Sequence, residues 1–264
     1  MKYSSTQLLV VGKTILLAGF SNAAVSTFSL GNLSGPVGTG GGVLNVPNAN
    51  APGGNLQVTV TSSVVSSSNN FHGSYGTTGQ GGQTATAPNF GFIFGASTNS
   101  SSAAGNSATT LTNFVQIKLA FSTPILLNDL TIRDIDRTSA SNDNGFIDTV
   151  WVEAQNSTVP VPVTYSTNPG TGLQAIPWAG TIAYRAATGS FANTGVGNPQ
   201  AHLITNTSAL VDCVIVYVNN SAGNPNFGDH GVDLGSEITV DVVPEPSSAL
   251  LLAFSAAFCL RRKR

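Results

Sequence analysis

The feature that most restricts the fold of this chain is the spacing of its apolar residues, which recur at every second position in short runs. In residues 56–61, for example, Leu56, Val58 and Val60 alternate with polar residues. A period of two places successive side chains on opposite faces of a β-strand. No long stretch between residues 24 and 243 has the period of 3.6 that an amphipathic helix requires. The pattern therefore predicts an all-β protein.

Glycine, asparagine and proline separate the apolar runs, as they do at turns. Regular spacing of this kind predicts about ten or eleven short strands in an antiparallel β-sandwich of jelly-roll type. The alternation slips at Asn128 and Asp129, which predicts an irregularity in that strand. The expected strands cover residues 26–30, 56–61, 89–94, 114–121, 125–135, 148–154, 161–165, 181–185, 201–204, 212–218 and 237–242.

The two ends of the chain differ from this body in composition. Residues 1–23 carry an early charge at Lys2, an apolar stretch interrupted by Lys13, and the small-x-small pattern Ser21-Asn22-Ala23. These features are typical of a signal peptide that signal peptidase removes. We therefore expect export, with one domain over residues 24–242.

The other end, residues 243–264, has three parts. Pro244-Glu245-Pro246 is an extended break, because proline restricts its own backbone and that of the residue before it. An apolar run of 14 residues follows and can form a short hydrophobic helix. Such a helix is roughly 21 Å long, short of the ~30 Å hydrocarbon core, so it suits transient membrane insertion better than a permanent anchor. Arg261, Arg262, Lys263 and Arg264 close the chain. The alternative is a helix that ends a soluble domain.

Val243-Pro244-Glu245-Pro246, the short apolar run and the basic end together resemble the PEP-CTERM sorting signal of exported bacterial proteins. The resemblance is limited to residues 243–264. It implies recognition by an exosortase, a membrane-embedded cysteine protease-transpeptidase, with a membrane-tethered precursor before processing. It also implies a Gram-negative-type cell surface or extracellular matrix and an association with exopolysaccharide and biofilm formation.

The charge of the expected body excludes several partners. Residues 24–242 contain four basic and eleven acidic residues, so their formal net charge is −7. The body has no basic patch that would bind nucleic acid or anionic lipid surfaces. An acidic body with few bases suits calcium or neutral glycans better than it suits these anionic partners. Cys213 is the only cysteine of the body and lies in a strand pattern, where it is expected to be a buried apolar side chain.

One acidic cluster has the residue types that calcium prefers. Asp134, Asp136, Asp143 and Asp148 lie around the junction of two expected strands, and Ca²⁺ takes six to eight oxygen ligands. In the alternative interpretation, Arg133 and Arg137 neutralise Asp134 and Asp136 in an ordinary loop. A second cluster, which includes Asp229, His230 and Asp233, would share the same ion if the fold brought the two together.

The signals for catalysis are weak, and we expect no enzyme. The chain has no Gly-x-Ser-x-Gly motif, and outside the tail its only glutamates are Glu153 and Glu237. Trp151 and Trp178 are candidates for stacking on sugar rings, with a core position as the alternative for each. The sequence predicts a non-catalytic structural, adhesive or glycan-binding protein, with a secreted hydrolase acting on polysaccharide or esters as the alternative.

Overall fold

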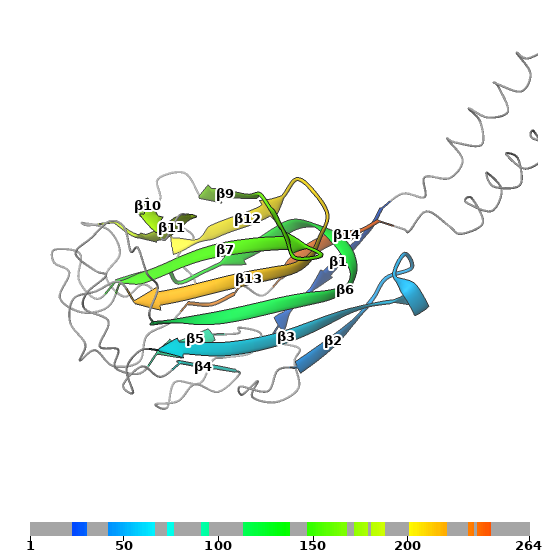
Figure 1. Ribbon diagram of the computed structural model, residues 1–264, viewed down its shortest axis with the longest axis horizontal. Helices are drawn as coiled ribbons and strands as arrows, with labels where there is room; N and C mark the ends of the chain where they lie inside the picture. Colours follow the sequence, from blue (N-terminus) through cyan, green and yellow to red (C-terminus); the bar gives the residue numbers. More distant parts are fainter. Residues whose placement is uncertain are drawn as a thin grey trace, which may run out of the picture.

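A computed structural model shows a protein made mostly of β-strands (Figure 1). The structure describes residues 23–30, 42–66, 73–76, 91–94, 113–137, 147–167, 172–178, 181–187, 201–220, 232–234 and 237–243. These residues contain no α-helix; strands, connecting turns and short 3-10 segments such as η2 (Pro52–Gly54) make up the described structure. The strands are β1 (Ala24–Phe28), β2 (Gly42–Pro47), β3 (Asn55–Ser66), β4 (Gly73–Gly76), β5 (Gly91–Phe94), β6 (Asn113–Ile132), β7 (Asp148–Asn156), β8 (Val159–Val161), β9 (Val163–Thr167), β10 (Leu173–Trp178), β11 (Thr181–Ala186), β12 (Leu203–Thr207), β13 (Val211–Asn220) and β14 (Ile238–Val242).

Twelve of these strands form one large antiparallel sheet. Its main order is β1-β14-β6-β13-β7-β11-β10. Three branches leave this order. β3 pairs with β6 and with β2, and β12 pairs with β6 and with β9. β8 pairs with β7. β4 and β5 form a separate two-stranded sheet. For the part of the chain that the structure describes, the prediction of an antiparallel β protein is confirmed.

Strand β6 organises the sheet because it has four partners. Its first part, up to Phe121, pairs with β3 and β13, and its second part, from Ile125, pairs with β14, with β12 and, through Ile125 and Val211, also with β13. Figure 1 shows β6 curving round at one end of the molecule between these parts. The prediction of two separate strands here is wrong, because the backbone stays extended through residues 122–124 and a single strand of 20 residues results.

The predicted irregularity at Asn128 and Asp129 is confirmed. Thr239 of β14 faces Asp129, but the next residue, Val240, faces Leu127. Asn128 is therefore an extra residue of β6 that faces no residue of β14, which is the geometry of a β-bulge.

Four observed strands, β4 and the three proline-containing strands β2, β8 and β10, were not predicted from the alternation. A loop was expected at β4. The other three each contain a proline, at Pro47, Pro160 and Pro177 respectively. Among the described strands each pairs on one side only, with β3, β7 and β11. Proline is tolerated at such edges because it lacks the N–H that an interior strand must donate.

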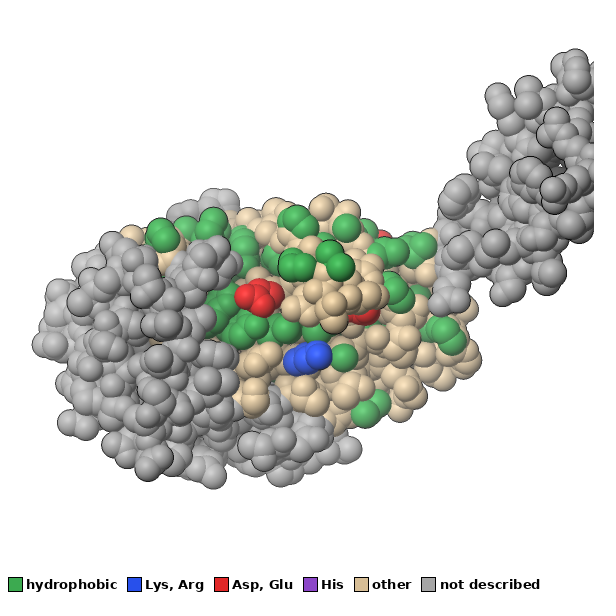
Figure 2. All heavy atoms as spheres, viewed as in Figure 1, with side chains coloured by type: hydrophobic (Ala, Val, Ile, Leu, Met, Phe, Trp, Pro, Cys, Tyr) green, Lys and Arg blue, Asp and Glu red, His purple; other side chains and the backbone are tan. Residues whose placement is uncertain are grey.

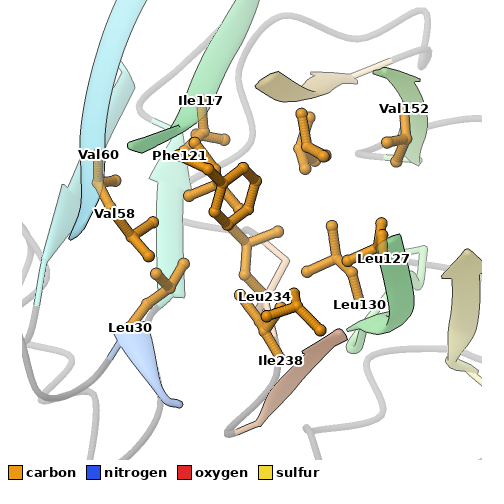
Figure 3. Close-up of a cluster of buried hydrophobic side chains, with 14 of the residues drawn as sticks. Leu30, Val58, Val60, Ile117, Phe121, Leu127, Leu130, Val152, Leu234 and Ile238 are labelled. Carbon is orange, nitrogen blue, oxygen red and sulfur yellow. The ribbon is translucent and has the colours of Figure 1, made fainter. Parts of the chain in front are cut away.

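The predicted alternation is confirmed at the core. Leu56, Val58 and Val60 have no exposed surface, whereas the residues between them are exposed. Residues from both parts of β6 enter the same buried cluster (Figure 3). The labelled side chains of Figure 3, which include Phe121, Leu130 and Val152, point into one shared interior. Complete burial of each such side chain contributes about 1.5–3 kcal/mol, so this interior is the main source of stability.

The first and the last strand of the sheet are partners. β1 pairs with β14, and Ala24 lies opposite Val242. The turn after β2 is tied to both strands: Asn48 Nδ2 donates to the carbonyl oxygen of Ala24 at 3.1 Å, and Asn50 Nδ2 donates to that of Val242 at 3.0 Å. The described chain therefore begins and ends at one place on the sheet.

None of the helical segments among the described residues has the length and apolar character needed to cross a bilayer. The expected signal peptide up to residue 22, and the expected hydrophobic helix and basic end of the tail, lie outside the described residues.

Candidate functional site

The charged residues predicted from the sequence gather where β6 ends and β7 begins. Residues 133–137 follow β6, and the chain returns through Ile147 to Asp148, the first residue of β7. Two isolated antiparallel bridges hold this region, Arg133 with Asp233 and Arg137 with Ile147. Asp134, Asp136 and Asp148 lie in this region, and so does Asp233 of the second predicted cluster. Asp143, Asp229 and His230 lie outside the described residues.

Arg133 and Asp233 are joined through both backbone and side chain. The N–H of Arg133 donates to the carbonyl oxygen of Asp233 at 2.6 Å, and the N–H of Asp233 donates back at 2.9 Å. The guanidinium Nη2 of Arg133 also forms an ion pair with the Asp233 carboxylate. Asp233 is buried, and a buried carboxylate needs such a partner because its desolvation is costly.

Asp136 and Asp148 form a second buried pair. The N–H of Asp148 donates to the carbonyl oxygen of Asp136 at 2.9 Å, and the N–H of Asp136 donates to Oδ2 of Asp148 at 3.4 Å. Burial raises the pKa of Asp148 well above its ordinary value, and the nearby charge of Asp134 raises it further. The backbone and side-chain hydrogen bonds with Asp136 oppose this rise of the pKa. Arg137, with 1% of its surface exposed, brings a positive charge into the same interior.

Asp134 lies between these two pairs and has the most unusual environment of the cluster. Its φ of 61° is in the left-handed region, which aspartate tolerates better than most residues. Its Oδ1 atom is buried and accepts no hydrogen bond. Burial raises the pKa of Asp134 to about 7, the charges of Asp136 and Asp233 add to the rise, and Arg133 opposes it. This carboxyl group therefore takes up a proton far more readily near neutral pH than an ordinary aspartate does.

The described side chains do not form a ready metal centre. No group of three or more histidine, cysteine, aspartate or glutamate side chains within the described residues is placed to hold one ion. Two arginines compensate part of the negative charge that a cation would otherwise neutralise. Among the carboxylate oxygens of the described cluster, Oδ1 of Asp134 is buried without a hydrogen bond and would suit a further cation. A calcium site here would therefore need oxygens from outside the described residues, such as those of Asp143.

The two tryptophans proposed for sugar stacking differ in what the structure describes. Trp151 lies on the opposite side of β7 from Val150 and Val152, as expected, and is 1% exposed. Its ring is stacked on Tyr217 of β13, with centroids 4.6 Å apart and planes 2° from parallel. Ile176 and Ala183, from the β10–β11 hairpin, complete this second buried cluster. The ring of Trp151 is thus covered. The side chain of Trp178 lies outside the described residues.

The sequence analysis missed the polar roles of two tyrosines. Tyr217 donates a hydrogen bond from its hydroxyl group to Oε2 of Glu153 at 2.9 Å. Burial raises the pKa of Tyr217, and the Glu153 carboxylate adds to the rise. Tyr165 of β9 bonds the backbone of Val152 through its hydroxyl group. The strand alternation places Tyr217 on the face of Cys213 and Ile215, but only the register between strands identifies the partners.

The remaining candidates have ordinary positions. Cys213 is buried, and burial raises the pKa of its thiol, which leaves it unreactive at neutral pH. Glu153 is half-buried, whereas Glu237 is exposed just before β14.

No protein-family model, curated protein or solved structure matches this chain.

Proposed function

We propose that this chain is an exported, non-catalytic protein of the bacterial envelope or extracellular matrix, which acts as a structural, adhesive or glycan-binding component. Its body, residues 24–242, is a β-sandwich of jelly-roll type. The course of β6 supports this architecture, because β3 pairs only with its first part and β14 and β12 only with its second, while both parts contribute to one core. A shared interior of this kind is what two packed layers of one strongly bent sheet would enclose.

The observation that carries this proposal is the pairing of Ala24 with Val242. The expected signal peptide ends at residue 23 and the expected sorting tail begins at residue 243, so both would leave the body at the same place. Neither segment is needed to complete the β1–β14 pair. This arrangement suits a cargo domain that two processing enzymes release without disturbing its sheet.

The sorting motif comprises Val243, Pro244, Glu245, Pro246 and the basic end, residues 261–264. In the proposed route, signal peptidase removes residues 1–23 during export. The tail then tethers the protein to the membrane until an exosortase acts on it, and the product reaches the cell surface or matrix of a Gram-negative-type bacterium. Of this motif only Val243 lies among the described residues, where it is exposed.

The processing route is tested by the mass of the protein isolated from its native host. A product that begins near Ala24 and has lost the basic end supports it. A polypeptide that retains both Met1 and Arg264 and is found inside the cell contradicts it.

The glycan-binding role is tested with an array of polysaccharides, and the hydrolase alternative with a panel of chromogenic glycosides and esters. The proposal predicts binding without turnover. Hydrolysis that disappears on substitution of Glu153 or Glu237 would replace it with the hydrolase.

Calcium at the charged cluster is a secondary part of the proposal. It is supported by the buried Oδ1 of Asp134, which accepts no hydrogen bond, and its proposed ligands are Asp134, Asp136, Asp143 and Asp148. Bound calcium would raise the melting temperature, since a ligand that binds only the native state stabilises it. Identical thermal unfolding in excess calcium and in excess chelator would remove this part of the proposal and leave the rest intact.

A further inference from the structure

Strand β9 is an edge of the twelve-stranded sheet. Among the described strands it pairs with β12 only. Apart from this pairing and the bonds of the Tyr165 hydroxyl group, residues 163–167 form no hydrogen bond with another described residue. Figure 1 shows β9 at the margin of the molecule, beyond β12. One side of its backbone therefore presents N–H and C=O groups to which a further strand can bond.

The four other edge strands of this sheet are each protected. β2, β8 and β10 contain a proline, which opposes pairing with a further strand. The turn after β2 covers the free side of β1: Asn48 Nδ2 donates to the carbonyl oxygen of Ala24 at 3.1 Å, and Ser26 Oγ donates to that of Pro47 at 3.3 Å. β9 contains neither a proline nor a charged residue. Within the described part of the sheet, it is the edge that lacks protection.

The groups that β9 presents select an extended polypeptide as the partner. Backbone N–H and C=O groups at the repeat of a strand are matched by the same groups of another strand, which adds to the sheet. A polysaccharide or a nucleic acid has no such repeat of donors and acceptors.

The charge distribution favours a second copy of this chain. The body has a formal net charge of −7, so two copies repel each other unless they meet at an uncharged surface. Residues 154–184, which contain β9, have no charged residue. Figure 2 shows only a few charged side chains on this face of the molecule. A basic partner would gain nothing from this edge and would be attracted to the acidic residues instead.

β9 is also complementary to itself in an antiparallel pair. A two-fold axis at Tyr165 places Thr164 of one copy opposite Ser166 of the other, so exposed hydroxyl groups face each other. Val163 then lies opposite Thr167. The remaining edges of a second copy are protected, so its own β9 is the edge that fits.

Pairing at β9 leaves the two ends of the body accessible. The sheet runs β9-β12-β6-β14-β1, so β9 is about 19 Å from β1 along the sheet at ~4.8 Å for each strand. The segments that leave the body at Ala24 and Val242 therefore do not compete with a second copy at β9.

We propose that two copies of this chain associate through an antiparallel β9–β9 pair, which joins their sheets. β9 has five residues, far fewer than the roughly 20–30 residues that each side of a standard interface contributes. The dimer is therefore weak and depends on concentration. This inference goes beyond the proposed function, because it requires neither a glycan nor the processing route.

The test uses charge reversal on the exposed face of β9 in the purified full chain. One variant combines Thr164→Lys with Ser166→Lys, and a second combines Thr164→Glu with Ser166→Glu. Each variant alone places like charges opposite one another, so its dimer should dissociate at about tenfold lower dilution or more. An equimolar mixture of the two variants places opposite charges together and should recover the association. Analytical ultracentrifugation over a range of concentrations measures each case.

Gln57→Lys with Thr59→Lys is the matched control, since both residues are exposed on β3, which has a partner strand on each side. The control should dimerise as the wild type does. Hydrogen exchange gives a second measurement: the amides of β9 in the wild type should exchange more slowly at high than at low concentration.

Four results would overturn the proposal. The wild type could remain monomeric at every concentration, or its association could be unaffected by both β9 variants, as association through another segment would be. The control could weaken the dimer as much as the β9 variants do. The mixture of the two variants could fail to recover association, which would exclude the two-fold pairing.

Discussion

The hydroxyl group of Tyr165 takes the place of a strand partner for Val152. It donates a hydrogen bond to the carbonyl oxygen of Val152 at 2.8 Å and accepts one from the N–H of the same residue at 3.2 Å. Val152 lies on the edge of β7 between the residues that pair with β11 and those that pair with β8. A side chain of β9 thereby closes a gap in the edge of another strand.

Substitution Tyr165→Phe should therefore destabilise the fold by about 1–3 kcal/mol, the cost of leaving buried polar backbone groups without partners. Val152 is 2% exposed, so water cannot readily replace the hydroxyl group. Chemical denaturation measures the change. Tyr184→Phe is the control, since the Tyr184 ring packs 5.0 Å from that of Tyr165. Equal losses in the two variants would contradict a specific contribution of the bonds between Tyr165 and Val152.

The turn between β2 and η2 should be the second sensitive point. Asn48 is 6% exposed and donates to both the Ala24 carbonyl oxygen and Ser26 Oγ. Asn48→Ala removes both bonds from a buried position and should cost about 1–3 kcal/mol. The exposed Asn45→Ala on β2 should change stability by less than about 0.5 kcal/mol.

Hydrogen exchange would locate the effect of Asn48→Ala. The amides of β1 and β14 should lose protection in this variant, because the turn holds the place where these strands meet. Protection that falls evenly over the whole sheet would contradict this role.

The core could be predicted from the sequence because the side-chain period of a strand is a local property. The alternation of Leu56, Val58 and Val60 identifies a buried face without knowledge of the neighbouring strands. The pairing of Ala24 with Val242 has no comparable local signal, since it joins opposite ends of the chain. The sheet order therefore had to come from the structure.

The same distinction applies to the candidate sites. Asp134, Asp136 and Asp148 could be grouped because they flank the junction of two successive strands. The bond of Tyr217 to Glu153 and that of Tyr165 to Val152 depend on registers between strands that are distant in sequence. A tyrosine in an alternating pattern shows which face it occupies, but not whether its hydroxyl group has a partner.

The buried carboxyl groups predict how stability depends on pH. The pKa of Asp134 is about 7 in the fold, above its ordinary value of 3.8. The native state therefore binds more protons than the unfolded state between about pH 4 and 7. Stability should fall as the pH rises through this window, because deprotonation then opposes folding. The raised pKa of Asp148 acts in the same direction.

Asp134→Asn tests this in buffer that contains a chelator. Asparagine also tolerates the left-handed φ of this position, so the backbone should be preserved. The variant should be more stable than the wild type at pH 8, and its stability should depend less on pH between 5 and 8. A wild type that gains stability steadily from pH 5 to 8 would contradict the raised pKa.

The covered position of Trp151 predicts its fluorescence. The chain has two tryptophans, so Trp178→Phe leaves Trp151 as the only indole. Its emission should be blue-shifted and weakly quenched by acrylamide, because Trp151 is 1% exposed beneath Ile176 and Ala183.

Adding Ile176→Ala removes part of this cover, so emission should shift to the red and quenching should increase. The cavity should also cost about 2–4 kcal/mol in unfolding free energy. Val159→Ala, at an exposed position of β8, is the control and should leave the spectrum unchanged. Strong quenching before Ile176 is altered would mean that the β10–β11 hairpin does not cover the indole in solution.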